Sequence, residues 1–151
     1  MELTEANAAA HAVLERLLME MIEAAVDGHV GTAQERCARL REAFASHLVA
    51  EEAHTLPLLR ELGGPLVKLA RIVDGDHRIV DRSLDAVAAM LAEAGPDGAD
   101  ARRAVLHRLE VLSKLKTVLE HHGVREQEDI YPPLDARFPN QPWAQDLIPS
   151  A

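Results

Sequence analysis

Cysteine, aromatic residues and uninterrupted apolar stretches are all scarce in this chain. The single cysteine, Cys37, excludes an internal disulfide and any metal site built from several cysteines, and a reducing cytoplasm is the natural setting. Charged residues interrupt every apolar stretch well before the roughly 18 uninterrupted residues that a membrane span needs. The amino terminus carries Glu2 and Glu5 where an export signal would be basic. We therefore expect a cytoplasmic protein that does not span a membrane.

Basic residues are also few. The sequence has 16 Lys and Arg against 25 Asp and Glu, which gives a formal net charge of −9. A nucleic-acid surface needs clustered basic side chains to displace counterions from the phosphates, so nucleic acid is excluded as a partner. This charge favours small molecules, cations, a protein partner or a second copy of the chain.

The residues that are abundant predict one helical domain. Hydrophobic residues make up 48% of the 151 residues, which is enough for a sizeable core. Glycine and proline divide the chain into four segments rich in Ala, Leu, Glu and Arg, at about 4–27, 32–62, 66–94 and 101–131. The short turns between them predict an all-α, up-down-up-down antiparallel four-helix bundle over residues 1–134. We expect no helix to continue past Pro132, so the proline-rich residues 135–151 are predicted to form an irregular tail packed on the bundle.

The predicted inward faces of these helices are apolar except at histidines and glutamates. The faces of the second and fourth segments read Leu40, Phe44, His47, Glu51, His54 and Leu58, and Val105, Leu109, Leu112, Leu119, His122, Glu126 and Ile130. The faces of the first and third segments read Ala8, His11, Leu14, Leu18, Ile22 and Ala25, and Val73, His77, Val80, Leu84, Val87 and Leu91. A buried carboxylate costs several kcal/mol unless it is paired or bound to a metal, and these faces contain no Lys or Arg. A bound cation is the simplest solution.

One pattern of eleven residues occurs twice, as HLVAEEAHTLP from His47 to Pro57 and as HGVREQEDIYP from His122 to Pro132. Residues four apart lie about 6 Å from each other on one helix face, so each copy directs an imidazole and a carboxylate to one point. Two copies plus one histidine from each other helix give six ligands, which suits two metal ions bridged by carboxylates better than one tetrahedral zinc. Counting helical rise places these residues at similar depths, provided that the fourth helix starts late.

These residues resemble the hemerythrin-like (HHE) cation-binding domain, in its bacterial single-domain form. The resemblance implies a non-haem di-iron centre with an oxo or hydroxo bridge, and it implies the ligands His11, His47, Glu51, His77, His122 and Glu126. It also implies that O2, peroxide or nitric oxide is the small ligand. Oxygen carriers of this family have a pair of histidines, four residues apart, on the third helix. Here Val73 and Asp81 flank His77 at that distance, which favours reactive chemistry at open iron positions over reversible oxygen carriage.

Several alternatives stay open. Imidazole and carboxylate ligands suit zinc and manganese as well as iron. The protein is therefore a di-iron protein, an iron or oxygen sensor acting through a protein partner, or a redox-inert bundle held by zinc. His54 is either a packing residue or a seventh ligand, and Tyr131 is expected to pack in the core. Because ligand histidines must be neutral, metal binding is expected to weaken as the pH falls below about 6.

Overall fold

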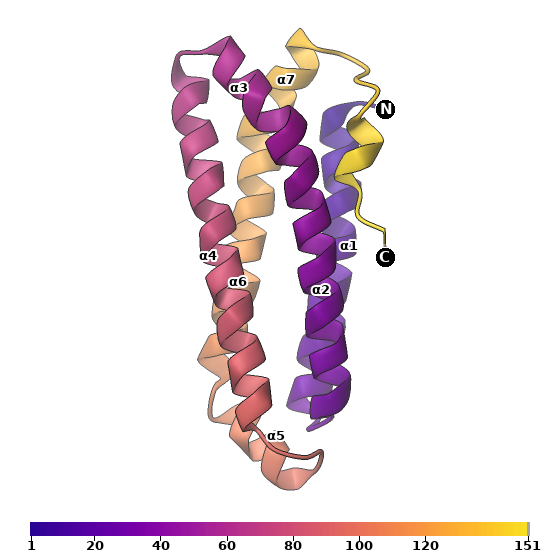
Figure 1. Ribbon diagram of the computed structural model, residues 1–151, viewed down its shortest axis with the longest axis vertical. Helices are drawn as coiled ribbons and strands as arrows, with labels where there is room; N and C mark the ends of the chain where they lie inside the picture. The colour runs from indigo at the N-terminus through magenta and orange to yellow at the C-terminus, as the bar shows by residue number, and fades with distance from the viewer. Residues whose placement is uncertain (151) are drawn as a thin grey trace.

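The computed structural model describes residues 1–150; Ala151, the last residue of the predicted tail, lies outside this range. The prediction of an all-helical fold is confirmed, because residues 1–150 form helices, turns and loops with no strand. Four long helical columns lie side by side in an elongated molecule (Figure 1). The columns are α1 (Leu3–Val26); α2 (Val30–Ala50) with the π-helical turn η1 (Glu51–Thr55) and α3 (Leu56–Leu62); α4 (Pro65–Glu93); and α5 (Ala99–Leu106), α6 (Leu109–Arg125), the π-helical turn η2 (Glu126–Ile130) and α7 (Tyr131–Arg137).

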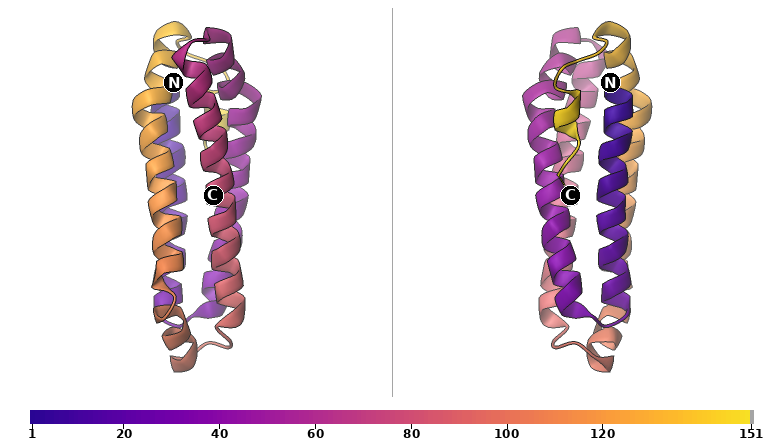
Figure 2. Two further views of the ribbon diagram at one scale, coloured as in Figure 1. Left: turned by 90° about the vertical axis from the view of Figure 1, so that its left-hand side faces the viewer. Right: turned by 90° about the vertical axis from the view of Figure 1, so that its right-hand side faces the viewer.

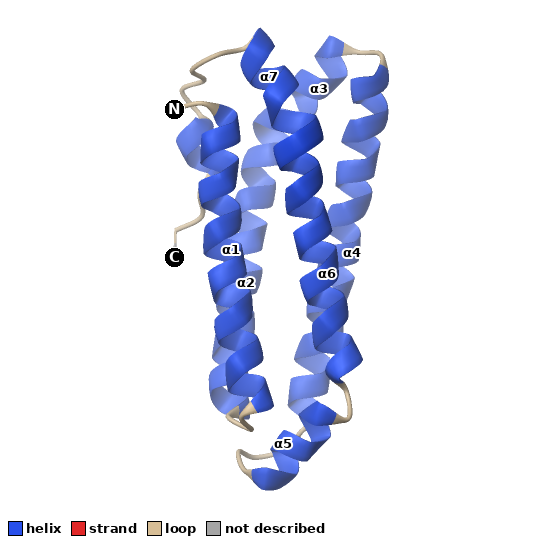
Figure 3. Ribbon diagram, turned by 180° about the vertical axis from the view of Figure 1, so that it is seen from behind, coloured by secondary structure: helices blue, strands red, loops and turns tan. Residues whose placement is uncertain are grey.

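Successive columns are joined at alternate ends of the molecule. The α1–α2 turn and the α4–α5 turn lie at one end, whereas the α3–α4 turn lies at the other end (Figure 3). Gly28, in the first of these turns, has a φ of +80°, and a Cβ there would lie 2.7 Å from the carbonyl oxygen of Gly98. The Gly98 N–H donates to the Gly28 carbonyl at 3.2 Å. Glycine at position 28 therefore lets the two turns at this end touch.

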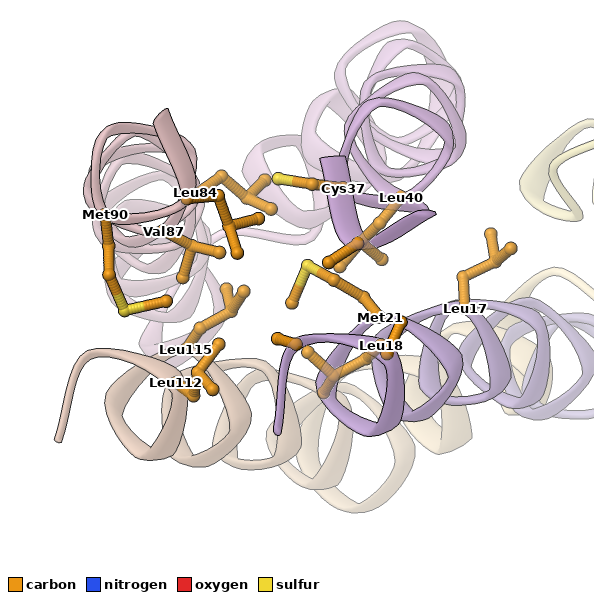
Figure 4. Close-up of a cluster of buried hydrophobic side chains, with 14 of the residues drawn as sticks. Leu17, Leu18, Met21, Cys37, Leu40, Leu84, Val87, Met90, Leu112 and Leu115 are labelled. Atoms are coloured by element: carbon orange, nitrogen blue, oxygen red, sulfur yellow. The ribbon is translucent and has the colours of Figure 1, made fainter. Parts of the chain in front are cut away.

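Two apolar clusters fill the space between the columns. The larger one lies toward the end that contains α5 and includes residues of all four columns (Figure 4): Leu17, Leu18, Met21, Cys37, Leu40, Leu84, Val87, Met90, Leu112 and Leu115. The second lies toward the other end and includes Leu3, Ala6, Leu56, Leu59, Val73, Ile130, Tyr131, Leu134, Ala144 and Leu147. Along each column, the predicted metal ligands come between residues of the larger cluster and residues of the second cluster. The six residues therefore share one layer with apolar side chains on both sides.

The fourth column differs from the single helix predicted over residues 101–131. Arg108 has φ −123° and ψ 29°, which interrupts the helix between α5 and α6. Leu109, predicted to face inward, is 44% exposed because it begins a new helix after this break. Because of the break, α6 begins at Leu109, later in the chain than the predicted helix. Such a late start was required to place His122 at the depth of the other candidate ligands.

The two prolines of the repeated pattern do not end their helices, so the expectation that no helix continues past Pro132 is wrong. Pro57 and Pro132 are the second residues of α3 and α7, and the helical backbone is continuous ahead of both, since Thr55 and Ile130 have right-handed helical dihedrals. A π-helical turn precedes each of them. The Leu56 N–H donates to the Glu51 carbonyl, and the Tyr131 N–H donates to the Glu126 carbonyl, five residues back in both cases.

The extra residue in each π-helical turn rotates the helix that follows by about 100° relative to a continuous α-helix. Thr55 and Leu59 are consequently buried, while His54 and Leu58, which the α-helical spacing predicted to face inward, are only half-buried.

The C-terminal residues are only partly irregular, contrary to the prediction. Helix α7 continues to Arg137, and a 3-10 helix, η3 (Ala144–Leu147), follows a short loop. Figures 1 and 2 show η3 lying alongside α1 and α2, near the end that holds the N-terminus. The Asp135 carboxylate accepts hydrogen bonds from the Leu3 and Thr4 N–H groups at 2.7 and 2.9 Å, which caps the start of α1. Within residues 1–150, no helix is both long and apolar enough to cross a membrane.

Candidate metal centre

The structure brings the six predicted ligands together. His47, Glu51, His122 and Glu126 are fully buried, His77 is 3% exposed, and the His11 side chain is 17% exposed. Two overlapping groups have donor atoms within 4.8 Å of one another: His11, His47, His122 and Glu126, and Glu51, His77, His122 and Glu126. The groups share His122 and Glu126, so the layer has the composition of two adjacent cation sites with common ligands.

The two carboxylates lie at the centre of this arrangement. Glu126 Oε2 lies 2.7 Å from His11 Nε2 and 3.7 Å from His47 Nε2, and its Oε1 lies 2.9 Å from His122 Nε2. Glu51 Oε2 lies 3.0 Å from His77 Nε2, and its Oε1 lies 3.6 Å from His47 Nε2. Each carboxylate therefore faces imidazoles from at least two columns. Both glutamates are the first residue of a π-helical turn.

Several of these buried donor atoms make no hydrogen bond of acceptable geometry among residues 1–150: His47 Nε2, both ring nitrogens of His122, and Glu126 Oε1, although His122 Nε2 and Glu126 Oε1 lie 2.9 Å apart. Within the same range, no Lys or Arg pairs with Glu51 or Glu126. An unsatisfied buried polar atom costs about 1–3 kcal/mol, and more when the group is charged. Imidazole nitrogens and carboxylate oxygens are also the donors that iron, manganese and zinc accept. The residues present therefore fit a metal.

The electrostatics of the metal-free layer agree with this conclusion. Burial alone would lower the pKa of His47, but the Glu51 and Glu126 carboxylates raise this pKa to about 9. Burial likewise opposes protonation of His122, while Glu126 and Asp76 raise its pKa to about 10. Burial would raise the pKa of Glu126, yet His122, His11 and His47 hold it well below its usual value. At neutral pH the His47 and His122 rings are thus protonated beside Glu126, and a metal ion that binds them must displace these protons.

Oxygen atoms lie behind two of the histidine rings, and the one behind His47 is within hydrogen-bond distance. The His47 ring donates from Nδ1 to the Leu147 carbonyl at 2.8 Å. Asp76 Oδ2 lies 3.9 Å from His122 Nδ1 and forms a salt bridge with Arg125. Metal-binding histidines usually direct their second nitrogen to such an oxygen, which fixes the tautomer and the ring orientation. Sequence reasoning missed Asp76, although an acidic residue directly before a predicted ligand was a signal that could have found it.

Tyr131 was expected only to pack in the core, but it also contacts the site. Its hydroxyl donates to Glu51 Oε1 at 2.6 Å and lies 3.2 Å from Thr55 Oγ1, and the side chain is fully buried. Burial, with the neighbouring Glu51 and Glu126 carboxylates, raises the pKa of Tyr131 well above its usual value. Tyr131 is therefore a protonated hydrogen-bond donor to Glu51.

His11 is the most exposed of the six residues because it borders a cavity. This cavity, of about 280 Å³, lies between α1 and the fourth column and is lined by Ala8, His11, Glu15, Leu18, Leu119, Glu120, Gly123, Val124 and Gln127. A Cβ on Gly123 would lie 2.7 Å from His11 Nδ1, so glycine at this position makes room for the imidazole. Small molecules can thus approach the site at His11.

The other residues considered in the sequence lie outside the layer. His54 stacks on Trp143 with ring centroids 4.8 Å apart, and its Nε2 lies 3.9 Å from Asp146 Oδ2. Asp81 is exposed on α4. His54 is not in either of the two groups of candidate ligands.

Comparison with known proteins gives the same class of site. The sequence model of the Hemerythrin HHE cation binding domain matches residues 3–134, so the chain belongs to this family of cation-binding helical domains. Searches of curated proteins and of solved structures gave no significant match. Residues 138–150, which include the carbonyl that contacts His47, lie beyond the matched range.

Proposed function

We propose that this protein is a di-iron protein whose antiparallel four-helix bundle binds two iron ions and that it binds O2, or reacts with peroxide or nitric oxide, at positions the side chains leave open. The ligands would be His11, His47, Glu51, His77, His122 and Glu126. The observation that carries the proposal is the set of buried donor atoms without hydrogen-bond partners in one layer between two apolar clusters. Family membership supports a cation, and commonly iron, in this place.

Bound iron would supply the redox chemistry, and the chain's own residues would control access and orientation. Six side chains offer fewer donors than two six-coordinate ions accept, which leaves room for a small ligand. The cavity beside His11 provides an approach from solvent. Tyr131 holds Glu51 in place through its hydroxyl, while the apolar residues on both sides of the layer limit the entry of water.

The first test is metal analysis of protein purified without added metal, together with anomalous scattering at the iron edge. We expect about two iron ions per chain and visible absorption. A colourless protein that contains zinc would contradict the proposal and would support the zinc-held bundle, which the same ligand types also suit. Consumption of peroxide by the iron-loaded protein would then distinguish chemistry at the site from a sensor that acts through a protein partner.

The ligand set is tested by Glu126→Gln, which keeps the shape of the side chain but removes the charge that faces three histidines. We expect this variant to bind less than half of the metal bound by the unmodified chain while its helical circular dichroism is retained. Glu128→Gln is the matched control, because it makes the same change at an exposed glutamate of the same turn that is in neither group of candidate ligands. Full metal content in Glu126→Gln would contradict the proposed ligand set.

A further inference from the structure

The hydrogen bond between His47 and Leu147 decides which nitrogen of His47 is free to bind a metal. A carbonyl oxygen only accepts hydrogen bonds, so His47 Nδ1 must carry the proton in the contact of 2.8 Å. In the neutral ring the lone pair is then on Nε2. This atom is buried without a hydrogen-bond partner among residues 1–150 and faces Glu51 Oε1 and Glu126 Oε2 at 3.6 and 3.7 Å. The carbonyl thus selects the tautomer that can bind a cation in the layer.

Only a few side chains hold this carbonyl in place. Leu147 and Ala144 of η3 are 0% and 1% exposed and belong to the apolar cluster that contains Leu3 and Tyr131. Trp143 stacks on His54 at the outer side of the second column. Between α7 and η3 the chain is a loop in which Pro139, Asn140 and Pro142 are exposed, and Asn140 has a φ of +53°. The position of η3 therefore depends on its own contacts with α1 and α2 and not on a continuous helix.

We propose that docking of the C-terminal segment 144–150 on the bundle and metal binding at the site stabilise each other. The inference rests on the proposed function, because it requires His47 to bind the metal through Nε2. Docking presents the correct tautomer, so it raises metal affinity. Because such coupling is reciprocal, bound metal must stabilise the docked segment by the same factor. The segment lies beyond the residues that the family model matches, so family membership does not by itself imply this coupling.

The expected loss of metal affinity follows from the kind of contact that is removed. Removal of an oxygen that orients a metal-binding histidine typically lowers metal affinity by about 10–100-fold. Leu147→Ala removes the fully buried side chain that anchors the carbonyl, and Trp143→Ala removes a half-buried ring that stacks on His54 and packs against the same apolar cluster. Neither variant removes a metal ligand or the carbonyl itself, so both act through the docking of the segment.

The experiment uses the full chain and compares Leu147→Ala with Leu91→Ala. Both leucines are fully buried, but Leu91 lies in the larger apolar cluster, away from the layer. Fe(II) affinity is measured without oxygen by competition with a coloured chelator, and urea unfolding of the metal-free variants reports stability. We expect Leu147→Ala to bind Fe(II) about 10-fold or more weakly than Leu91→Ala, although both lose stability. Trp143→Ala should shift affinity in the same direction, and it keeps the test valid if Leu147→Ala does not fold.

A second measurement detects the reciprocal effect. Backbone hydrogen exchange in residues 144–150 of the unmodified chain is compared with and without Fe(II), and we expect slower exchange in the loaded protein. Equal Fe(II) affinity in the variants and the control, or exchange in residues 144–150 that does not respond to Fe(II), would overturn this inference alone. If the unmodified chain bound no Fe(II), the proposed function would fail, and this inference would fail with it.

Discussion

Metal binding should release close to two protons per chain at pH 7. The perturbation is the addition of a divalent metal to metal-free protein. The pKa of His47 is about 9 and that of His122 about 10, so both rings are protonated at neutral pH. A metal binds only the neutral imidazole, so each ring must lose its proton on loading. Two displaced protons also mean that the binding constant rises by about two powers of ten per pH unit between pH 7 and 8, or about 2.7 kcal/mol per unit.

The assay is calorimetric titration with Zn(II) at pH 7 in two buffers that differ in ionisation enthalpy. The difference in observed heat gives the number of protons released. Glu126→Gln should release fewer protons, because Glu126 is the nearest carboxylate that raises the pKa of His122. Release of less than one proton by the unmodified chain, or an affinity that stays constant from pH 7 to 9, would refute the reasoning. An unperturbed histidine titrates near 6.5, which is why the sequence alone predicts the loss of binding only below about pH 6.

Three further predictions concern the site and its neighbours. The metal-free protein should lose stability as the pH rises from about 7 to 10. Protonated His47 and His122 stabilise the fold, and this stabilisation is complete only below the pKa of an unfolded histidine, near 6.5. Urea unfolding that showed stability rising over this range would contradict the prediction. Gly123→Ala should lower metal content by displacing His11, whereas Gly75→Ala, where a Cβ meets nothing within 4 Å, should not; equal metal content in the two would count against a role for His11. Tyr131→Phe should lower the free energy of unfolding by about 1–3 kcal/mol, since Glu51 loses a buried donor, and an unchanged urea midpoint would argue against that contact.

The accuracy of sequence reasoning differs between columns for physical reasons. On α4 the predicted inward residues are all buried, because this helix runs without interruption: Val73, His77, Val80, Leu84, Val87 and Leu91. On α1 the register is less accurate, since Asn7 is buried and Ala8 is exposed. Asn7 Nδ2 donates to Gln127 Oε1 at 3.3 Å across the bundle, a contact that no local pattern records.

The contacts that orient the ligands were hidden from the sequence by distance along the chain. The Leu147 carbonyl acts on His47 across 100 residues, and it is a backbone atom, so its residue type carries no signal. Asp76 lies near His122 only because α4 and α6 pack together. The clustering of the candidate ligands was predictable because each copy of the repeated pattern places a histidine and a glutamate on one helical face, and buried carboxylates need a partner.

The prolines of the repeated pattern explain why Tyr131 reaches the site. In a continuous α-helix a proline ring clashes with the carbonyl four residues before it. A π-helical turn ahead of the proline adds a residue and moves that carbonyl away from the ring, and in both copies the turn begins at the candidate ligand glutamate. The added residue rotates the next helix so that Thr55 and Tyr131 face the layer, where the Tyr131 hydroxyl reaches Glu51. The pattern thus supplies candidate metal donors through its histidine and glutamate, and in the second copy the register ahead of the proline places the Tyr131 hydroxyl beside one of them.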